Sequence, residues 1–299
     1  HRESRGLGDV YKRQVISTAV SELLDGKTKY TRGQGSPALC EAVANHLMKT
    51  SNISVSPENV LITPGAKQAL LYSYMTVLNP GDEAILLSPS WASYEPMISI
   101  IGGVPVNVPV DRKNFHPDMD AIRSSITNRT RMIMVNSPCN PTGAVYAREE
   151  IEEIVSIAIE HDLWIVSDEI YSRLIWNGGE HVSPATIEGG KERTIVISGW
   201  SKTWAMTGMR VGFLAGPEQA VRAAVKCQAN SASHIPTFMM EAARVALDCD
   251  DHVERFSDAY RQRRKLMVQG LEDIPGLRIV NPEGAFYLFI DVSGTGMSD

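Results

Sequence analysis

Short β-branched, apolar runs alternate with longer amphipathic segments over most of the chain, and this alternation is the strongest constraint on its fold. Segments with helical periodicity, such as 66–78 and 149–161, separate these runs. Strands that alternate with helices are typical of a mostly parallel sheet covered by helices on both faces. The sequence therefore predicts an α/β fold whose large domain contains a seven-stranded sheet. The seven expected strands are 60–63, 83–87, 104–108, 132–135, 163–167, 194–197 and 211–215.

The large domain is expected to span residues 15–262. It opens with an amphipathic helix at 15–24, and Ser36 followed by Pro37 is a typical cap and first turn of the next helix. Residues 1–14 are charged, contain glycine and show no periodicity of either kind. We therefore expect them to be a leader unrelated to the fold.

A second, smaller unit is expected at the end of the chain. Residues 262–270 have the pattern of a helix, and 277–280 and 286–291 have the pattern of strands. Residues 263–299 are thus predicted to begin a small α/β domain. Because the chain stops soon after the last expected strand, we expect this domain to be truncated.

Charge and cysteine usage argue against several classes of function. The 29 basic and 35 acidic residues give a net charge of −6, which does not indicate a nucleic-acid or anionic-membrane partner. No apolar run approaches the ~18 residues that a membrane-spanning helix needs. The cysteines lack metal-ligand spacing and fit a reducing, cytoplasmic environment. They are Cys40, Cys139, Cys227 and Cys249.

Chemically distinctive residues follow the expected strands, at the edge where open α/β sheets bind ligands. Gly65 stands between a strand and a helix, where free backbone N–H groups can hold an anion. Trp91 could stack on a planar ring, and two prolines hold Asn140 in a rigid turn. Asp168 ends a buried strand. Alone, each has a simpler explanation, such as a core tryptophan, a plain turn or a helix-capping aspartate.

Lys202 follows the sixth expected strand, with Arg210 eight residues further on. A lysine at such a place can form an imine with a carbonyl if its surroundings keep the amine neutral. From an ordinary value of ~10.4, this needs a pKa lower by roughly three units, or about 4 kcal/mol. Burial and a nearby cation such as Arg210 can lower the pKa by that much. A solvated lysine is the simpler explanation for Lys202 alone.

One ligand matches the whole set of residues at the strand ends. It is an aromatic aldehyde with a phosphate, a phenolic oxygen and a basic ring nitrogen, namely pyridoxal 5'-phosphate. The ordered segments that carry the match are YTRGQG, TPGAKQA, PSWASY, NSPCNPTG, SDEIY and SKTWAMTGMRVG. On these segments the chain resembles the fold-type-I pyridoxal-phosphate enzymes and, among them, the class I/II, aspartate-aminotransferase-like group.

The resemblance implies roles for the residues around the cofactor ring. Lys202 is similar to the Schiff-base lysine that later moves a proton between substrate and cofactor. Asp168 is similar to the acid that pairs with the ring nitrogen, which keeps that nitrogen protonated. Tyr171 and Asn140 match the donors to the phenolic oxygen. Trp91 matches the aromatic side chain stacked on the ring.

The resemblance also implies a phosphate site and a second subunit. Its phosphate ligands would be the backbone at Gly65, Ala66 and Lys67 and the side chains of Ser201 and Arg210. Tyr30 matches a residue that reaches the phosphate of the neighbouring subunit, so a homodimer is expected. Many members carry a phosphate-binding serine where this chain has Gly199. The substrate-carboxylate arginine of the family is expected beyond residue 299.

The expected activity is a ping-pong exchange of an amino group between an amino acid and a 2-oxo acid. β-Elimination or another reaction at the substrate α-carbon would use the same site, so it remains an alternative. A cofactor-sensing module of a transcription regulator is another, and it would require a DNA-binding helix pair upstream. No metal ion is expected in any of these.

Overall fold

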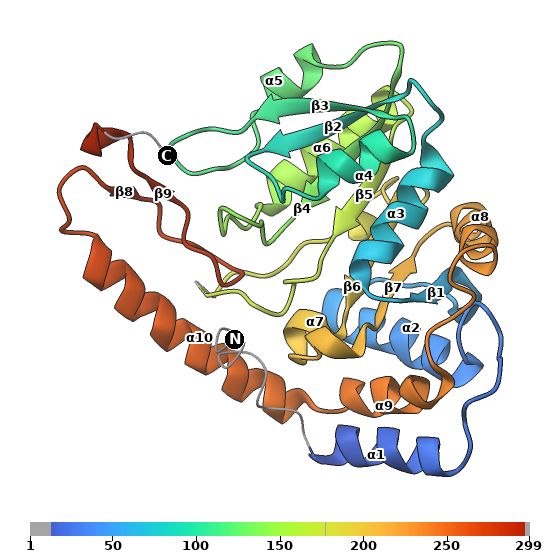
Figure 1. The fold of residues 1–299 in the computed structure, drawn as a ribbon. Helices are drawn as coiled ribbons and strands as arrows, with labels where there is room; N and C mark the ends of the chain where they lie inside the picture. Colours follow the sequence, from blue (N-terminus) through green and yellow to red (C-terminus); the bar gives the residue numbers. More distant parts are fainter. Residues whose placement is uncertain (1–12, 177, 297–299) are drawn as a thin grey trace.

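The computed structural model of the protein describes residues 13–176 and 178–296. The expected leader lies outside the described residues except for Arg13 and Gln14, which begin the first helix, α1. The described residues form a large unit around a central sheet and a smaller C-terminal unit (Figure 1). None of the described helices combines the length and the apolar character that a membrane crossing requires.

The described residues contain a sheet of seven strands, as predicted, in the order β1-β7-β6-β5-β4-β2-β3. β7 pairs antiparallel with β1 and β6, and the other four pairings are parallel. The expectation of a mostly parallel sheet is therefore confirmed. The strands are β1 (Val60–Thr63), β2 (Glu83–Ser88), β3 (Val104–Pro109), β4 (Thr130–Asn136), β5 (Trp164–Asp168), β6 (Thr194–Gly199) and β7 (Gly212–Ala215).

Helices cover both faces of the sheet, because alternate strand residues point to opposite sides. On β4, Met132 and Met134 pack in a core with residues of α3, α4 and α8, whereas Ile133 and Val135 pack with residues of α5 and α6. The helices are α1 (Arg13–Leu24), α2 (Pro37–Ser51), α3 (Ala66–Val77), α4 (Tyr94–Ile100), α5 (Met119–Ser124), α6 (Arg148–Glu160), α7 (Trp200–Thr203), α8 (Glu218–Ala229), α9 (Thr237–Leu247) and α10 (Asp250–Leu271).

The same alternation continues at the other end of the sheet. Ile62 of β1 and Phe213 of β7 lie in a core with α1, α2 and α9, while Leu61 and Leu214 face α3 and α8. The Ser36 hydroxyl accepts a hydrogen bond from the Leu39 N–H at 3.3 Å and so caps α2, as expected. These cores bury the sheet on both sides, which fixes the strand ends as a rigid edge.

The topology brings several strand ends to one edge of the sheet. β1, β2, β4, β5 and β6 run in the same direction, so their carboxyl ends lie together, whereas β7 runs in the opposite direction and begins there. The connections after these strands therefore converge on one place. This edge is where ligands bind in open α/β sheets.

The smaller unit consists of α10 and a two-stranded antiparallel sheet of β8 (Arg278–Ile279) and β9 (Ile290–Asp291). Figure 1 shows α10 leading from α9 to this sheet along the outside of the molecule. The expected boundary at residues 262 and 263 falls inside α10, which continues without interruption.

The expected strand at 286–291 is shorter in the structure, where β9 covers Ile290–Asp291. The residues before it bond instead to the large unit. The N–H groups of Glu283 and Gly284 both donate to the Gly143 carbonyl at 2.8 Å, and that of Ala285 donates to Leu174 at 2.8 Å. The chain is thus held beside the carboxyl edge of the sheet rather than paired along β8.

Candidate active site

A cavity of about 230 Å³ lies at the carboxyl edge of the sheet. Nine of the eleven residues predicted for the site line it: Ala66, Lys67, Trp91, Asn140, Asp168, Tyr171, Ser201, Lys202 and Arg210. Gly65 lies directly behind the Arg210 guanidinium. Tyr30 lies outside the cavity; it is 89% exposed and its ring contacts that of His234.

Asp168 is the last residue of β5 and is buried. Its Oδ2 accepts a hydrogen bond from the Tyr94 hydroxyl at 2.8 Å, and its Oδ1 accepts one from the Ile170 N–H at 3.2 Å. Burial raises the pKa of Asp168 to about 6, against the opposing effects of these two hydrogen bonds and of the nearby Lys202 charge. A buried carboxyl that titrates near neutrality can form a strong pair with a protonated nitrogen in the cavity.

Lys202 lies in α7, directly after β6, and is half-buried. Burial lowers the pKa of its amine and the Arg210 charge lowers it further, whereas the Asp168 charge raises it. The amine nitrogen lies 5.2 Å from the centre of the Phe286 ring and 5.9 Å from that of Tyr171. This aromatic surround accounts for the desolvation, which favours the neutral, nucleophilic amine.

Three hydrogen-bonding groups face the cavity between Lys202 and the end of β4. The Tyr171 and Tyr287 hydroxyls lie 2.7 Å apart, and the Asn140 side-chain amide donates to Tyr287 at 3.3 Å. Burial raises the pKa of Tyr171 far above its ordinary value, so the phenol keeps its proton at neutral pH. Tyr171 and Asn140 can both donate to an oxygen atom bound in the cavity.

Asn136 fixes the positions of Asp168 and Asn140. Its amide donates to the Asp168 carbonyl at 2.9 Å, and its carbonyl oxygen accepts from the Asn140 N–H at 2.8 Å. The side chain therefore ties the end of β4 to the end of β5 and to the turn that carries Asn140. A buried bridge of this kind holds the site's polar groups at fixed separations.

The start of α3 forms an anion cradle with Arg210. The first turn of a helix leaves N–H groups without intrahelical acceptors, and the helix dipole favours negative charge there. Gly65 has a φ of +85°, and a Cβ atom at this position would lie 2.5 Å from Nη2 of Arg210. Gly212 is equally constrained, because its Cβ would lie 2.4 Å from the Ala66 nitrogen. Gly65 thus lets the guanidinium approach the start of α3, and Gly212 lets the backbone of β7 do so.

Gly199 stands at the position where the resemblance described above leads us to expect a phosphate-binding serine. A Cβ atom there would lie 2.8 Å from Cα of Gly212 and 2.9 Å from the Val211 carbonyl oxygen. No side chain fits at this position without a shift of the backbone. Ser201 and Thr207, which both line the cavity, carry hydroxyl groups that could reach an anion there.

Trp91 contributes an aromatic wall to the cavity. Its ring meets that of Tyr94 edge to face, with the centres 5.3 Å apart. The Lys67 amine lies 4.7 Å from the centre of the Trp91 ring and donates to the Ser93 hydroxyl at 3.1 Å. The lysine thus places a positive charge beside the aromatic wall.

Sequence reasoning assigned no role to three residues that now belong to the site, namely Tyr94, Asn136 and Tyr287. Tyr94 stands three residues after Trp91 and Asn136 four before Asn140, so proximity to these residues could have indicated them. Tyr287 comes from the small unit. Its approach depends on the backbone bonds of Glu283 and Gly284 to Gly143, for which the sequence carries no local signal.

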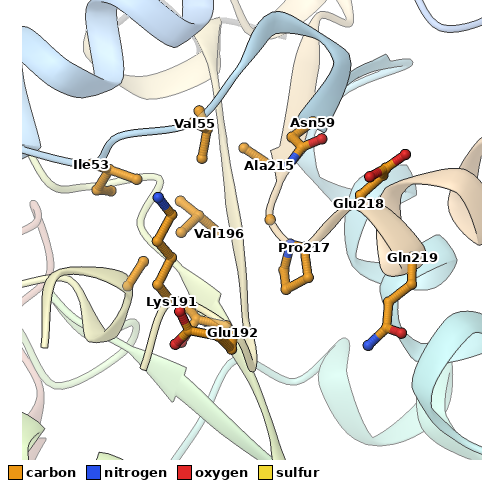
Figure 2. Close-up of a pocket in the computed structure, with 13 residues that line it drawn as sticks. Ile53, Val55, Asn59, Lys191, Glu192, Val196, Ala215, Pro217, Glu218 and Gln219 are labelled. Atoms are coloured by element: carbon orange, nitrogen blue, oxygen red, sulfur yellow. The ribbon is translucent and has the colours of Figure 1, made fainter. Parts of the chain in front are cut away.

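A second cavity, of about 440 Å³, lies at the opposite edge of the sheet, near the start of β6 and the end of β7. Figure 2 shows Lys191, Glu192 and Glu218 around a lining that includes Val55 and Val196. None of the residues predicted for the site lines this cavity. The smaller cavity is therefore the better candidate for chemistry, although the larger one offers more space.

The chain matches known proteins over nearly its whole length. The family described as aminotransferase class I and II matches residues 11–298. An aspartate aminotransferase of Musicola paradisiaca is 41% identical over 95% of this chain and 72% of its own. An aspartate/prephenate aminotransferase of Thermus thermophilus is 42% identical over 93% of this chain and 73% of its own.

The fold agrees with this match. The crystal structure of an aromatic aminotransferase from Pyrococcus horikoshii superimposes with a TM-score of 0.93 at 37% identity, covering 97% of this chain and 80% of that one. Sequence and structure thus lead to the same conclusion, namely that this chain belongs to the class I and II aminotransferases.

Proposed function

We propose that this chain binds pyridoxal 5'-phosphate and exchanges an amino group between an L-amino acid and a 2-oxo acid in a ping-pong reaction. The observation that carries the proposal is the placement of Lys202 and Asp168 in the wall of one cavity of about 230 Å³. An amine of lowered pKa and a buried carboxyl can there bind different parts of one flat ring.

The donor set fits this cofactor. Gly65, Ala66 and Lys67 at the start of α3, with Ser201 and Arg210, supply the positive charge and N–H groups that a phosphate needs. Tyr171 and Asn140 supply donors for a phenolic oxygen. The match between the donors and the cofactor's polar groups supports the assignment.

When bound, the cofactor supplies a ring that withdraws electrons from the substrate α-carbon. Asp168 holds a proton on the ring nitrogen, because its negative charge favours the protonated form. Lys202 would hold the aldehyde end of the cofactor through its amine while no substrate is bound. With substrate bound, the same amine would be the group that takes the proton from the substrate α-carbon, which requires the amine to be neutral.

We infer that an acidic amino acid is the first amino donor to test and an aromatic one the second. Aspartate, prephenate and aromatic amino acids appear in the names of the related aminotransferases. The Lys67 ammonium beside Trp91 favours an anionic group at the cavity. Acidic and aromatic amino acids both carry an α-amino group and an α-carboxylate, so one site can take its amino group from either kind.

We also propose a cytoplasmic homodimer in which exposed Tyr30 reaches the phosphate bound by the partner subunit. The exposure of Tyr30 leaves its hydroxyl free for such a contact. The cysteines fit a location in which thiols stay reduced. As domain organisation we propose a large cofactor-binding domain over residues 15–262 and the start of a small domain at 263–299, with α10 running across the boundary.

Incubation of the purified chain with the cofactor, L-aspartate and 2-oxoglutarate tests the activity. The proposal requires glutamate and oxaloacetate in equal amounts, and parallel initial-rate lines in double-reciprocal plots. Phenylalanine replaces aspartate in a second assay. Release of ammonia and a 2-oxo acid from the donor without amino transfer would instead establish elimination chemistry and contradict the proposal.

A further inference from the structure

A buried ionic cluster lies directly behind Asp168. Glu169 follows Asp168 at the end of β5, and neighbouring residues of an extended strand point to opposite sides. Asp168 lines the cavity and Glu169 does not. The Glu169 side chain is 3% exposed, and its N–H donates to the Ile197 carbonyl at 2.8 Å. The two carboxylates thus follow each other in sequence, but only one faces the cavity.

Three donors hold the Glu169 carboxylate. The Ser167 and Ser183 hydroxyls donate to Oε1 at 2.9 and 2.5 Å, and Nε2 of His181 lies 2.8 Å from Oε2. Hydrogen bonds to a carboxylate favour its ionised form. Glu169 is therefore held at both of its carboxylate oxygens by side chains of the protein.

The surroundings of His181 determine the net charge of the cluster. Its side chain is 6% exposed, and Nδ1 is buried with no hydrogen-bond partner among the described residues. A doubly protonated ring would bury an unpaired N–H together with a positive charge. A neutral ring with its proton on Nε2 leaves only an unpaired acceptor, which costs less. The hydrogen-bond geometry thus favours a ring that does not cancel the charge of Glu169.

This charge acts on the cavity through Asp168. Burial is the main cause of the raised pKa of Asp168, and the Glu169 charge raises it further. A negative charge that favours a proton on Asp168 also favours a proton on any nitrogen that pairs with Asp168. The negative charges of Asp168 and Glu169 therefore both favour a proton at the same point of the cavity.

We propose that Glu169, held by His181 and two serines, is a positioning residue that acts through Asp168 to keep a proton on the cofactor's ring nitrogen. The inference rests on the proposed function and assigns to this chain a second acid behind the one that touches the ring. Glu169 contributes charge, and His181 contributes orientation without cancelling that charge.

Two ligands that differ by one atom test this inference. Pyridoxal phosphate and its analogue with C–H in place of the ring nitrogen are titrated into the apoprotein, with the quenching of tryptophan fluorescence as readout. The wild type should prefer the natural cofactor. Glu169→Gln keeps the size and loses the charge, so the preference should fall by about tenfold, which corresponds to one pKa unit at the nitrogen.

Matched variants separate charge from packing. Glu169→Asp restores the charge and should restore most of the preference. Ser183→Ala removes one hydrogen bond but no charge, so its ratio of affinities should equal that of the wild type. His181→Gln retains a donor and should also keep the wild-type ratio, and this variant decides the matter if Glu169→Gln does not fold. A higher ratio in His181→Gln would mean a cationic histidine and would overturn the proposal.

Equal weakening of both ligands in Glu169→Gln would show a purely structural role and would also overturn it. Failure of the wild type to bind pyridoxal phosphate would refute the proposed function itself. Binding by the wild type with an unchanged ratio in Glu169→Gln would refute the inference alone.

Discussion

The Tyr94 hydroxyl donates a hydrogen bond of 2.8 Å to the Asp168 carboxylate, from the first turn of α4 to the last residue of β5. Both side chains are buried, so the bond is not exposed to competing water. It joins the connection after β2 to the acid at the centre of the candidate site. The aromatic wall formed by Trp91 and the carboxyl are thereby held as one unit.

Tyr94→Phe should weaken cofactor binding more at pH 6.5 than at pH 8.5. In the wild type, the hydrogen bond from Tyr94 lowers the pKa of Asp168. Without this bond, the pKa of Asp168 rises above its present value of about 6. More of the carboxyl is then protonated at the lower pH and unable to pair with a protonated nitrogen. Fluorescence titrations with pyridoxal phosphate at both pH values check this. Tyr72→Phe, which loses a 2.6 Å hydrogen bond to Ser231, is the control and should show no such pH dependence.

Lys202→Ala should abolish the visible absorbance that develops when pyridoxal phosphate is added to the protein, because that band requires an amine bonded to the aldehyde. Amino transfer should disappear with it. Lys191→Ala changes a lysine at the opposite edge of the sheet and should keep both signals. A persistent band in the Lys202 variant would refute the assignment of this lysine.

Asp168→Asn should retain the visible absorbance but slow the removal of the substrate α-proton. The amide cannot favour a protonated ring nitrogen, so the ring accepts electrons less well. We expect a loss of about two orders of magnitude, the scale of one proton-transfer group. Exchange of the aspartate α-proton in deuterated water, followed by NMR, measures the step directly. An unaltered exchange rate would mean that another group serves the nitrogen.

Gly199→Ser should destabilise the protein despite the serine found here in many relatives of this type. The new Cβ would lie 2.8 Å from Cα of Gly212, and such overpacking costs about 1–3 kcal/mol in the free energy of unfolding. Affinity for inorganic phosphate should fall as well, because Gly212 packs against the start of α3. Urea unfolding and phosphate titration measure the two effects. Gly208→Ala meets no atom within 4 Å and is the matched control.

His116→Gln should cost more stability at pH 6 than at pH 8.5. The His116 ring lies 2.8 Å from Glu150 and 3.2 Å from Glu283, and the hydrogen bond to Glu150, opposed by burial, raises its pKa. A raised folded-state pKa gives stability that is complete below the unfolded value of about 6.5 and is lost as the pH rises through the folded value. Urea unfolding at both pH values tests this sign. An equal loss at the two pH values would exclude the charged form of His116 as the cause.

The sequence predicted the sheet well because buried strands need apolar, β-branched residues. The expected strand at 60–63 coincides with β1, and both ends of each of the other six lie within two residues of the expected position. The cavity residues were predictable because parallel strands bring their ends together, so that distant segments such as those of Asp168 and Lys202 meet there. The order of the strands and the residues that follow each strand were enough to predict which side chains line the cavity.

Two aspects could not be predicted from local patterns. The segment at 286–291 has the composition of a strand, yet Ala285 bonds to Leu174 and leaves β9 with only two residues. Tertiary contacts override local propensity at such places. The approach of Tyr287 to Tyr171 follows from the same contacts, since a residue's distance from the cavity depends on where its segment docks.

The contact between Tyr171 and Tyr287 also sets an order for the assembly of the protein on the ribosome. Lys202 and the sheet edge are translated first, and the hydroxyl that completes the cavity wall follows 85 residues later (287 minus 202). The wall can close only after the segment that carries Tyr287 has been made.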